Sequence, residues 1–298
     1  MNLPANSSYL WVNNLRLRTL NWGEAGDEPV ILLLHGLASN ARIWELTAPL
    51  LAEQGWRVIA PDLRGHGQTD KPETGYDFNS YRADLTALLG ALDVRRPVLV
   101  GHSWGASLAV DYAAHYPVGP LSPRGIVLVD GGVIQLDQTP GATWEIVRDR
   151  LTPPRLAGMA LADFLLRIDN WNSTWKPDEQ MRQIILANFE IDADEHIKPH
   201  LRFENHMQIV RAMWEFKTYL AMEKLMCPVL AVPAQPEQAK SGGGDEFYRL
   251  KQEGIHRAAE ILSDLRVSWM ADSVHDIPLQ HPDKLVQLLV DFVRDLPR

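Results

Sequence analysis

The chain has 298 residues, enough for one large domain or a domain with a sizeable insertion, and its 46% hydrophobic and 22% charged residues are typical of a globular protein. It carries 29 lysines and arginines against 38 aspartates and glutamates, a net charge of −9, which argues against nucleic acid as a partner. Cys227 is the single cysteine, so an intrachain disulfide is excluded and a reducing compartment is favoured.

Residues 1–14 lack a basic flank followed by an apolar stretch, and no segment of the sequence approaches the length needed to span a bilayer. We therefore expect a cytoplasmic protein that does not associate with membranes. Its expected state is a monomer or a homodimer.

The first 133 residues alternate short apolar runs, typical of strands, with longer runs of helical period. A hairpin is expected near residues 9–22. Further strands are expected over residues 30–34, 58–60, 98–100, 125–129, 229–232 and 266–270, and helices over residues 41–54, 81–92, 106–115 and 282–293. This alternation predicts an α/β fold with a mostly parallel central sheet flanked by helices, because both faces of such a sheet must be covered.

Between residues 134 and 222 the strand signal is absent, and apolar residues recur at helical spacing. We expect this segment to be helical. It would be inserted into a core domain formed by residues 1–133 and 223–298.

The most informative motif is Gly101-His102-Ser103-Trp104-Gly105, which joins an apolar strand to a helical pattern. A Gly-X-Ser-X-Gly turn in this context holds the serine in a strained conformation with its hydroxyl exposed. Small residues are needed on both sides because the backbones nearly touch. Ser103 is therefore a candidate nucleophile.

A serine hydroxyl needs a base within hydrogen-bond reach, and histidine suits that role near neutral pH. His275 follows the last expected strand and precedes the final helix, so it would face the same rim of the sheet as Ser103. We expect His275 to be the base. His281, before a proline at a helix start, is expected to be structural, and His102, inside the elbow turn, is expected to be a packing or hydrogen-bonding residue rather than the base.

Acyl transfer also needs N–H groups that point at the developing oxyanion. The N–H of Trp104 directly follows the nucleophile and lies at a helix N-terminus. The N–H of Leu37 follows His35-Gly36 at the end of a strand. These two groups are the expected oxyanion hole.

The polar residues Glu195, His196, His200, Glu204 and His206 resemble a metal cluster in composition. Pro199 breaks the helical register that would bring the histidines together, so a solvated segment is expected there. No metal and no organic cofactor is implied.

Four ordered motifs resemble the α/β-hydrolase family with a helical cap. His35-Gly36-Leu37 resembles its oxyanion turn, and residues 62–67, Asp-Leu-Arg-Gly-His-Gly, resemble a structural loop after the next strand. Residues 101–105 resemble the nucleophile elbow, and His275 the late histidine. The resemblance covers residues 9–133 and 225–296, and it implies a Ser-His-acid triad.

The acid of that triad departs from the family pattern. Most members carry an aspartate after the strand that matches residues 229–232, where this chain has Glu237. In a subset resembling haloalkane dehalogenases the acid follows the preceding strand, which here gives Asp130. The resemblance favours Asp130 over Glu237, and Asp245 is a weaker third option.

We expect a serine hydrolase that cleaves a carboxylic ester or lactone of a small, fairly apolar substrate through an acyl-enzyme on Ser103. The Ser-Trp elbow also resembles that of prolyl aminopeptidases, and serine C–C bond hydrolases share the scaffold. An alternative of another class is a non-catalytic binder that uses the capped pocket as a receptor.

Overall fold

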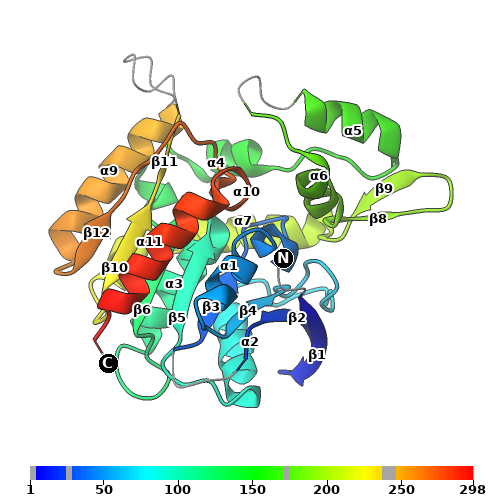
Figure 1. Cartoon of the computed structure of the whole chain (residues 1–298). Helices are drawn as coiled ribbons and strands as arrows, with labels where there is room; N and C mark the ends of the chain where they lie inside the picture. The colour runs from blue at the N-terminus through cyan, green and yellow to red at the C-terminus, as the bar shows by residue number, and fades with distance from the viewer. Residues whose placement is uncertain (1–4, 25–28, 171–174, 237–245, 298) are drawn as a thin grey trace.

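The computed structural model describes residues 5–24, 29–170, 175–236 and 246–297. Within these residues, a central sheet of eight strands has the order β1-β2-β4-β3-β5-β6-β10-β12 (Figure 1). Its strands are β1 (Asn6–Val12), β2 (Leu15–Trp22), β3 (Ile31–Leu34), β4 (Val58–Pro61), β5 (Val98–His102), β6 (Gly125–Val129), β10 (Val229–Val232) and β12 (Leu265–Val267).

Most of this sheet is parallel. The β1–β2 and β2–β4 pairings are antiparallel, and every pairing from β4 to β12 is parallel. The first hairpin turns at Asn13 and Asn14, both with positive φ, which asparagine tolerates and which suits the twist of a two-residue hairpin. The predicted α/β class and the predicted N-terminal hairpin are therefore confirmed.

Helices cover both faces of the sheet (Figure 1). Ile31 and Leu33 pack with α1 (Ala48–Glu53) and α11 (Pro282–Asp295) on one face. Leu32 and Leu34 point to the other face, which is covered by α2 (Phe78–Ala91), α3 (Trp104–His115) and α9 (Glu246–Ile261). This alternation puts two apolar cores on opposite sides of one sheet.

Two predicted elements are divided in the structure. The helix expected over residues 41–54 is a 3-10 turn, η1 (Ala41–Trp44), followed by α1, because Pro49 cannot donate the N–H that a continuous helix requires. The strand expected over residues 266–270 is β12 followed by β13 (Met270–Ala271), which pairs with β11 (Ala234–Gln235). Helix α9 had not been predicted.

The segment between β6 and β10 contains helices, as expected, but the prediction that it lacks strands is wrong. Strand β9 pairs on its two sides with β7 and β8 in a small antiparallel sheet. These strands have two to four residues, too few to show a period of two in the sequence. The elements are η2 (Leu136–Gln138), α4 (Trp144–Leu151), β7 (Met159–Ala160), α5 (Leu161–Asp169), α6 (Glu179–Leu186), β8 (Phe189–Ile191), β9 (His196–Pro199), α7 (Phe203–Glu215) and α8 (Thr218–Met222).

This segment has a small apolar cluster of its own, formed by Phe164, Ile168, Leu186 and Ile197. The segment is also joined to the rest of the chain by a hydrogen bond, in which the side-chain amide of Asn40 donates to the side-chain oxygen of Asn188 at 2.5 Å. In Figure 1, α5, α6, β8 and β9 lie beyond one end of the central sheet. Over the described ranges, every helix is too short or too polar to span a lipid bilayer.

Candidate active site

Ser103 lies at the turn between β5 and α3, with φ 54 and ψ −118. This positive φ is strained for a residue other than glycine. A Cβ atom on Gly101 would lie 2.2 Å from the carbonyl oxygen of Gly105, and one on Gly105 would lie 2.3 Å from that of Leu34. Only glycine fits at these two positions, so the motif occupies the tight strand-turn-helix context in which it exposes a serine.

His275 lies in the loop between β13 and α10 (Ile277–Gln280). Its Nδ1 atom is 2.6 Å from Oδ2 of Asp130, the residue that directly follows β6. The two side chains are 145 positions apart in sequence. They meet because β6 pairs with β10, and β11, just beyond β10, pairs in turn with β13.

The carboxylate of Asp130 is 1% exposed and has a donor on each oxygen. Besides the His275 contact on Oδ2, Oδ1 accepts the N–H of Ala234 at 2.8 Å and the ammonium of Lys251 at 2.9 Å. Burial raises the pKa of Asp130, but the hydrogen bond and charge of His275, the charge of Lys251 and the Ala234 N–H outweigh it and lower the pKa to about 2. Asp130 is therefore ionised at neutral pH.

The other two candidate acids, Glu237 and Asp245, lie outside the described residues. Among the described carboxylates, Asp130 is the one whose side chain contacts the His275 ring by a hydrogen bond. Asp276 adjoins His275 in the chain and adds negative charge near the ring.

The His275 side chain is 47% exposed, in contrast to its buried partner. Desolvation lowers its pKa, but the hydrogen bond and charge of Asp130 outweigh that effect and leave the pKa above its usual 6.5. Within the described residues, no hydrogen bond links the Ser103 hydroxyl to another group. Gly131, next to Asp130, approaches the serine so closely that a Cβ atom there would lie 2.3 Å from the Ser103 carbonyl oxygen.

His102 lies beside His275. Its Nε2 donates to the His275 carbonyl at 2.9 Å, and the two ring centroids are 4.8 Å apart. Burial, together with the charge of His275, lowers the pKa of His102 to about 4. A neutral His102 therefore supports the loop that carries His275. The side chain of His281 likewise contacts a backbone carbonyl, that of Asp272, at 3.2 Å.

The two expected oxyanion donors belong to segments that adjoin Ser103. Trp104 is the first residue of α3, so its N–H has no partner within the helix. Leu37 follows β3 and lies one residue beyond Gly36, where a Cβ atom would be 3.0 Å from the Ser103 Cβ atom. The Leu37 turn therefore runs directly alongside the serine.

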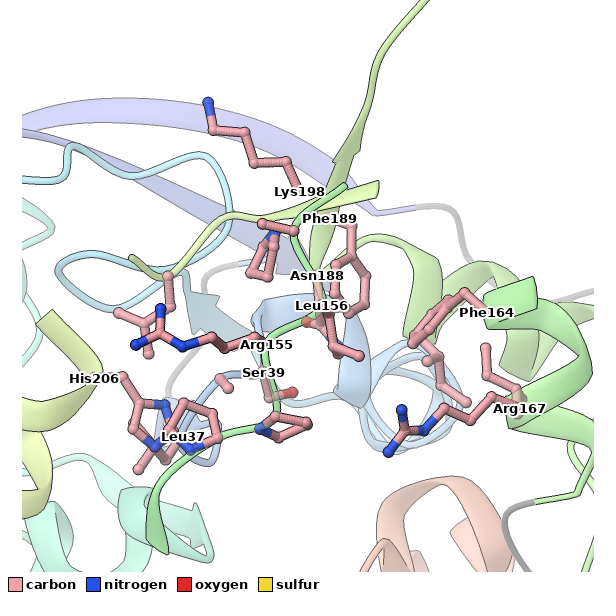
Figure 2. A pocket seen from close by; sticks show the side chains of 18 of the residues that line it. Leu37, Ser39, Arg155, Leu156, Phe164, Arg167, Asn188, Phe189, Lys198 and His206 are labelled. Carbon is pink, nitrogen blue, oxygen red and sulfur yellow. The ribbon is translucent and has the colours of Figure 1, made fainter. Parts of the chain in front are cut away.

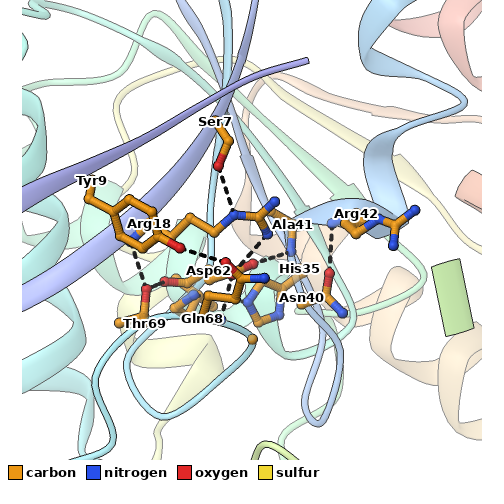
Figure 3. Close-up of polar contacts among 12 residues, drawn as sticks. Ser7, Tyr9, Arg18, His35, Asn40, Ala41, Arg42, Asp62, Gln68 and Thr69 are labelled. Carbon is orange, nitrogen blue, oxygen red and sulfur yellow. Dashed lines mark hydrogen bonds and ion pairs between the residues drawn. The ribbon is translucent and has the colours of Figure 1, made fainter. Parts of the chain in front are cut away.

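Buried polar contacts hold this turn in place (Figure 3). Asp62 accepts the N–H of Ala41 at 2.8 Å and pairs with Arg18 at 3.2 Å. His35 accepts the N–H of Leu63 at 3.0 Å, and burial lowers its pKa to about 4, so the ring is neutral. The loop at residues 62–67 thus has a structural part in fixing the turn that carries Leu37.

A cavity of about 1190 Å³ opens beside this site (Figure 2). It is lined by Leu37 and Asp276 from the core and by residues of the segment between β6 and β10. Ser103 is not among its lining residues. A smaller cavity of about 140 Å³ is lined by His275 and shares Asp276 and Ile168 with the larger one. The larger cavity therefore meets the turn that carries Leu37, and the smaller one meets the imidazole of His275.

The polar residues at positions 195–206 are dispersed in the structure. His206 donates to the carbonyl of Leu151 at 3.0 Å, and His196 lies 3.6 Å from Asp192. Across the part of the chain that the structure describes, no three histidine, cysteine, aspartate or glutamate side chains form a group that could hold a metal ion.

Sequence reasoning missed Lys251, which contacts Asp130. The available signal was the face of α9, where Tyr248, Lys251, Gly254 and Ala258 recur at helical spacing and are buried. A lysine within an otherwise uncharged helix face indicates a buried partner of opposite charge.

Comparisons with known proteins agree with this architecture. The family model for the alpha/beta hydrolase fold matches residues 29–169. A 2-(acetamidomethylene)succinate hydrolase of Mesorhizobium japonicum is 44% identical over 99 residues, 33% of this chain and 35% of that protein. Epoxide hydrolase A of Mycobacterium tuberculosis is 44% identical over 96 residues, 32% of this chain and 30% of that protein. These matches thus span only about a third of each relative.

Structural similarity extends over the whole chain. The crystal structure of an E-2-(acetamidomethylene)succinate hydrolase superposes with a TM-score of 0.77 at 23% identity, covering 98% of this chain and 100% of that one. At this sequence identity, the structural similarity shows the fold and not the activity. Together with the family match over residues 29–169 and the geometry of the elbow, it shows that this chain has the α/β-hydrolase fold.

Proposed function

We propose that the protein is a serine hydrolase that cleaves a carboxylic ester or lactone of a small, fairly apolar substrate. The 2.6 Å contact between Nδ1 of His275 and Asp130 carries the proposal. It orients the imidazole so that Nε2 is the nitrogen available as a base, next to the strained elbow that carries Ser103.

In the proposed reaction, Nε2 of His275 takes the proton of Ser103 as Oγ attacks the substrate carbonyl carbon. The N–H groups of Leu37 and Trp104 stabilise the oxyanion. The bond to the leaving alcohol then breaks, and His275 returns the proton to that alcohol. Water, deprotonated by the same histidine, then attacks the acyl carbon, the bond from that carbon to Oγ of Ser103 breaks, and His275 returns the proton to Oγ. The hydrogen bond between Ser103 and His275 forms in the substrate complex, as catalytic hydrogen bonds often do.

A serine at the elbow favours acyl transfer over epoxide opening. Epoxide opening through a covalent ester needs a carboxylate nucleophile, which position 103 does not supply. The regional identity to an epoxide hydrolase is therefore a likeness of scaffold rather than of reaction.

We also propose that residues 134–222 act as a cap on a core of residues 1–133 and 223–298. The large cavity has walls from both parts, and the bond between Asn40 and Asn188 joins them near its rim. Apolar side chains such as Leu156, Phe164 and Phe189 form much of the wall, which suits an apolar substrate (Figure 2).

A second candidate is cleavage of an amide in a substrate that carries a carboxylate. Arg155 and Arg167 both line the cavity, and no carboxylate within the described residues pairs with either one (Figure 2). The Arg155 guanidinium lies 4.3 Å from the centre of the Phe203 ring instead. Lys198, in contrast, pairs with Glu190 at 3.2 Å. The name of the succinate-derivative hydrolase relative points to the same substrate chemistry.

Labelling with a fluorophosphonate probe tests the nucleophile. We expect the native protein to be labelled at Ser103 and the Ser103→Ala variant to remain unlabelled. The control is Ser263→Ala, which changes an exposed serine outside the elbow and should leave labelling intact. An unlabelled native protein would favour the non-catalytic binder.

A matched pair of substrates separates the two candidate functions. p-Nitrophenyl butyrate and p-nitrophenyl hemisuccinate differ by a terminal carboxylate, and lactones, prolyl-naphthylamides and carboxylate-bearing amides complete the panel. If the arginines bind a carboxylate, the double variant Arg155→Met/Arg167→Met should raise KM for the hemisuccinate about tenfold and leave KM for the butyrate unchanged. Lys198→Met is the control. Equal effects on both esters would argue for the neutral substrate.

A further inference from the structure

The proposed triad has a fourth charged side chain behind it. Lys251 on α9 is 7% exposed, and its ammonium lies 2.9 Å from Oδ1 of Asp130 and 2.9 Å from the carbonyl oxygen of Ala234. A lysine is rarely buried to this degree unless it is paired, because its charge loses hydration. Here a carboxylate and a carbonyl compensate that loss.

The position of Lys251 follows from close packing of α9. A Cβ atom on Gly254 would lie 2.4 Å from the carbonyl oxygen of Val133, so the helix backbone approaches the loop after β6 as closely as only glycine allows. Lys251 lies one turn earlier on the same buried face. The helix therefore places the ammonium of Lys251 next to Asp130, the first residue of that loop.

The two oxygens of Asp130 have separate partners. Oδ1 accepts from Lys251 and from the Ala234 N–H, whereas Oδ2 faces Nδ1 of His275. Two donors fixed on Oδ1 prevent the carboxylate from rotating away from the imidazole. Asp130 itself has a positive φ of 44, so its backbone is also held in an unusual conformation.

We propose that Lys251 is a positioning residue of the Ser103–His275–Asp130 triad, which locks the Asp130 carboxylate toward His275 and offsets part of its negative charge. This inference rests on the proposed function. It adds to the triad a group that touches neither the substrate nor the reacting atoms and that acts only through Asp130.

The sign of the charge effect follows from the groups around His275. Asp130 and Asp276 raise the pKa of His275, and Lys251 lowers it. His102, whose ring lies tilted beside that of His275, is neutral because burial lowers its own pKa to about 4. Removing the Lys251 charge should therefore raise the pKa of His275 and extend the range of pH over which the base is protonated.

The size of the effect can be estimated from Coulomb's law. A unit charge on the order of 7 Å from the imidazole, across an effective dielectric constant of about 40, changes a pKa by about one unit. A functional consequence of this size is measurable in a pH profile, whereas a purely structural lysine would change stability without moving the profile.

The experiment measures the rate of Ser103 labelling by a fluorophosphonate from about pH 5 to 9 in the full-length protein. We expect Lys251→Gln to move the acid limb upward by about one pH unit and to slow labelling at the old midpoint several-fold. Lys251→Arg should restore the native limb. Lys284→Gln, at an exposed site on α11, removes the same charge from a side chain that is not a partner of Asp130 and should change nothing.

An acid limb that stays in place in folded Lys251→Gln would overturn the role of Lys251 and leave the proposed function intact. If that variant does not fold, Lys251→Met, which buries no polar group, provides the same comparison. A native protein whose Ser103 is never labelled would instead overturn the proposed function. Circular dichroism and the melting temperature identify which variants are folded.

Discussion

Replacing Asp130 by asparagine tests the proposed triad, because the structure fixes the direction in which the amide must face. The N–H of Ala234 and the ammonium of Lys251 converge on Oδ1. The asparagine oxygen has to take that position, since an NH₂ group there would meet two donors. The NH₂ group then faces Nδ1 of His275. The imidazole proton consequently moves to Nε2, the atom that should accept the proton of Ser103.

We expect kcat to fall about 10,000-fold, the loss that this tautomer exchange causes in serine protease triads, while KM changes little because the cavity wall is intact. Stability should fall as well. The pKa of Asp130 is lowered from 3.8 to about 2, so its ionisation contributes about 2 kcal/mol to folding at neutral pH. Because the folded pKa is the lower one, this contribution is present above about pH 4 and is lost as the pH falls through about 2.

The assay compares hydrolysis of p-nitrophenyl esters, fluorophosphonate labelling and urea unfolding for the native protein, Asp130→Asn and Asp283→Asn. Asp283 is an exposed aspartate on α11 and controls for the loss of one negative charge. If Asp130→Asn kept kcat within tenfold of the native value while Ser103→Ala was inactive, Asp130 would not be the acid, and the reasoning from its contacts would fail.

The remaining predictions concern pH and packing. The acid limb of kcat/KM should have its midpoint above pH 6.5, because the pKa of His275 is raised, and a limb below that value in a pH-rate profile would contradict the assignment. Gly105→Ala should lower the free energy of unfolding by about 1–3 kcal/mol, because the new Cβ atom would overlap a carbonyl oxygen of β3. Gly90→Ala, in open space on α2, should raise that free energy by about 0.5–1 kcal/mol. Urea unfolding measures both changes. In the same measurement, Arg64→Met should lower the free energy of unfolding by about 3–5 kcal/mol, because it leaves the buried carboxylate of Asp84 without its ion-pair partner. Arg95→Met breaks an exposed ion pair and should lower that free energy by less than about 1 kcal/mol.

Several parts of the site could be predicted because their signals are local in sequence. The elbow is one example, since the glycines that permit the strained Ser103 are two residues away on either side. The buried strands are another, because residues such as those at 125–129 form continuous apolar runs of the length that a parallel sheet requires. Ends of parallel strands meet at one edge, so the sequence also indicated that His275 would lie near the elbow.

Other features have weak local signals. Strands β7, β8 and β9 are too short to show a period, and Pro49 divides a helix whose apolar spacing is otherwise continuous. Lys251 was overlooked for a related reason, because a single lysine in a helix is ordinarily exposed. Only the depth at which α9 packs, set by Gly254 against Val133, makes this lysine a buried partner.

The sequence by itself determined the class of the fold, the serine at the elbow and the order of the motifs along the chain, because these depend on neighbours within a few residues. The tertiary structure decided which carboxylate meets His275 and which cation supports that carboxylate. Asp130 and Lys251 are 121 positions apart, and their contact exists only because two strands and a helix pack together. Such contacts depend on distances across the fold, which spacing along the chain does not encode.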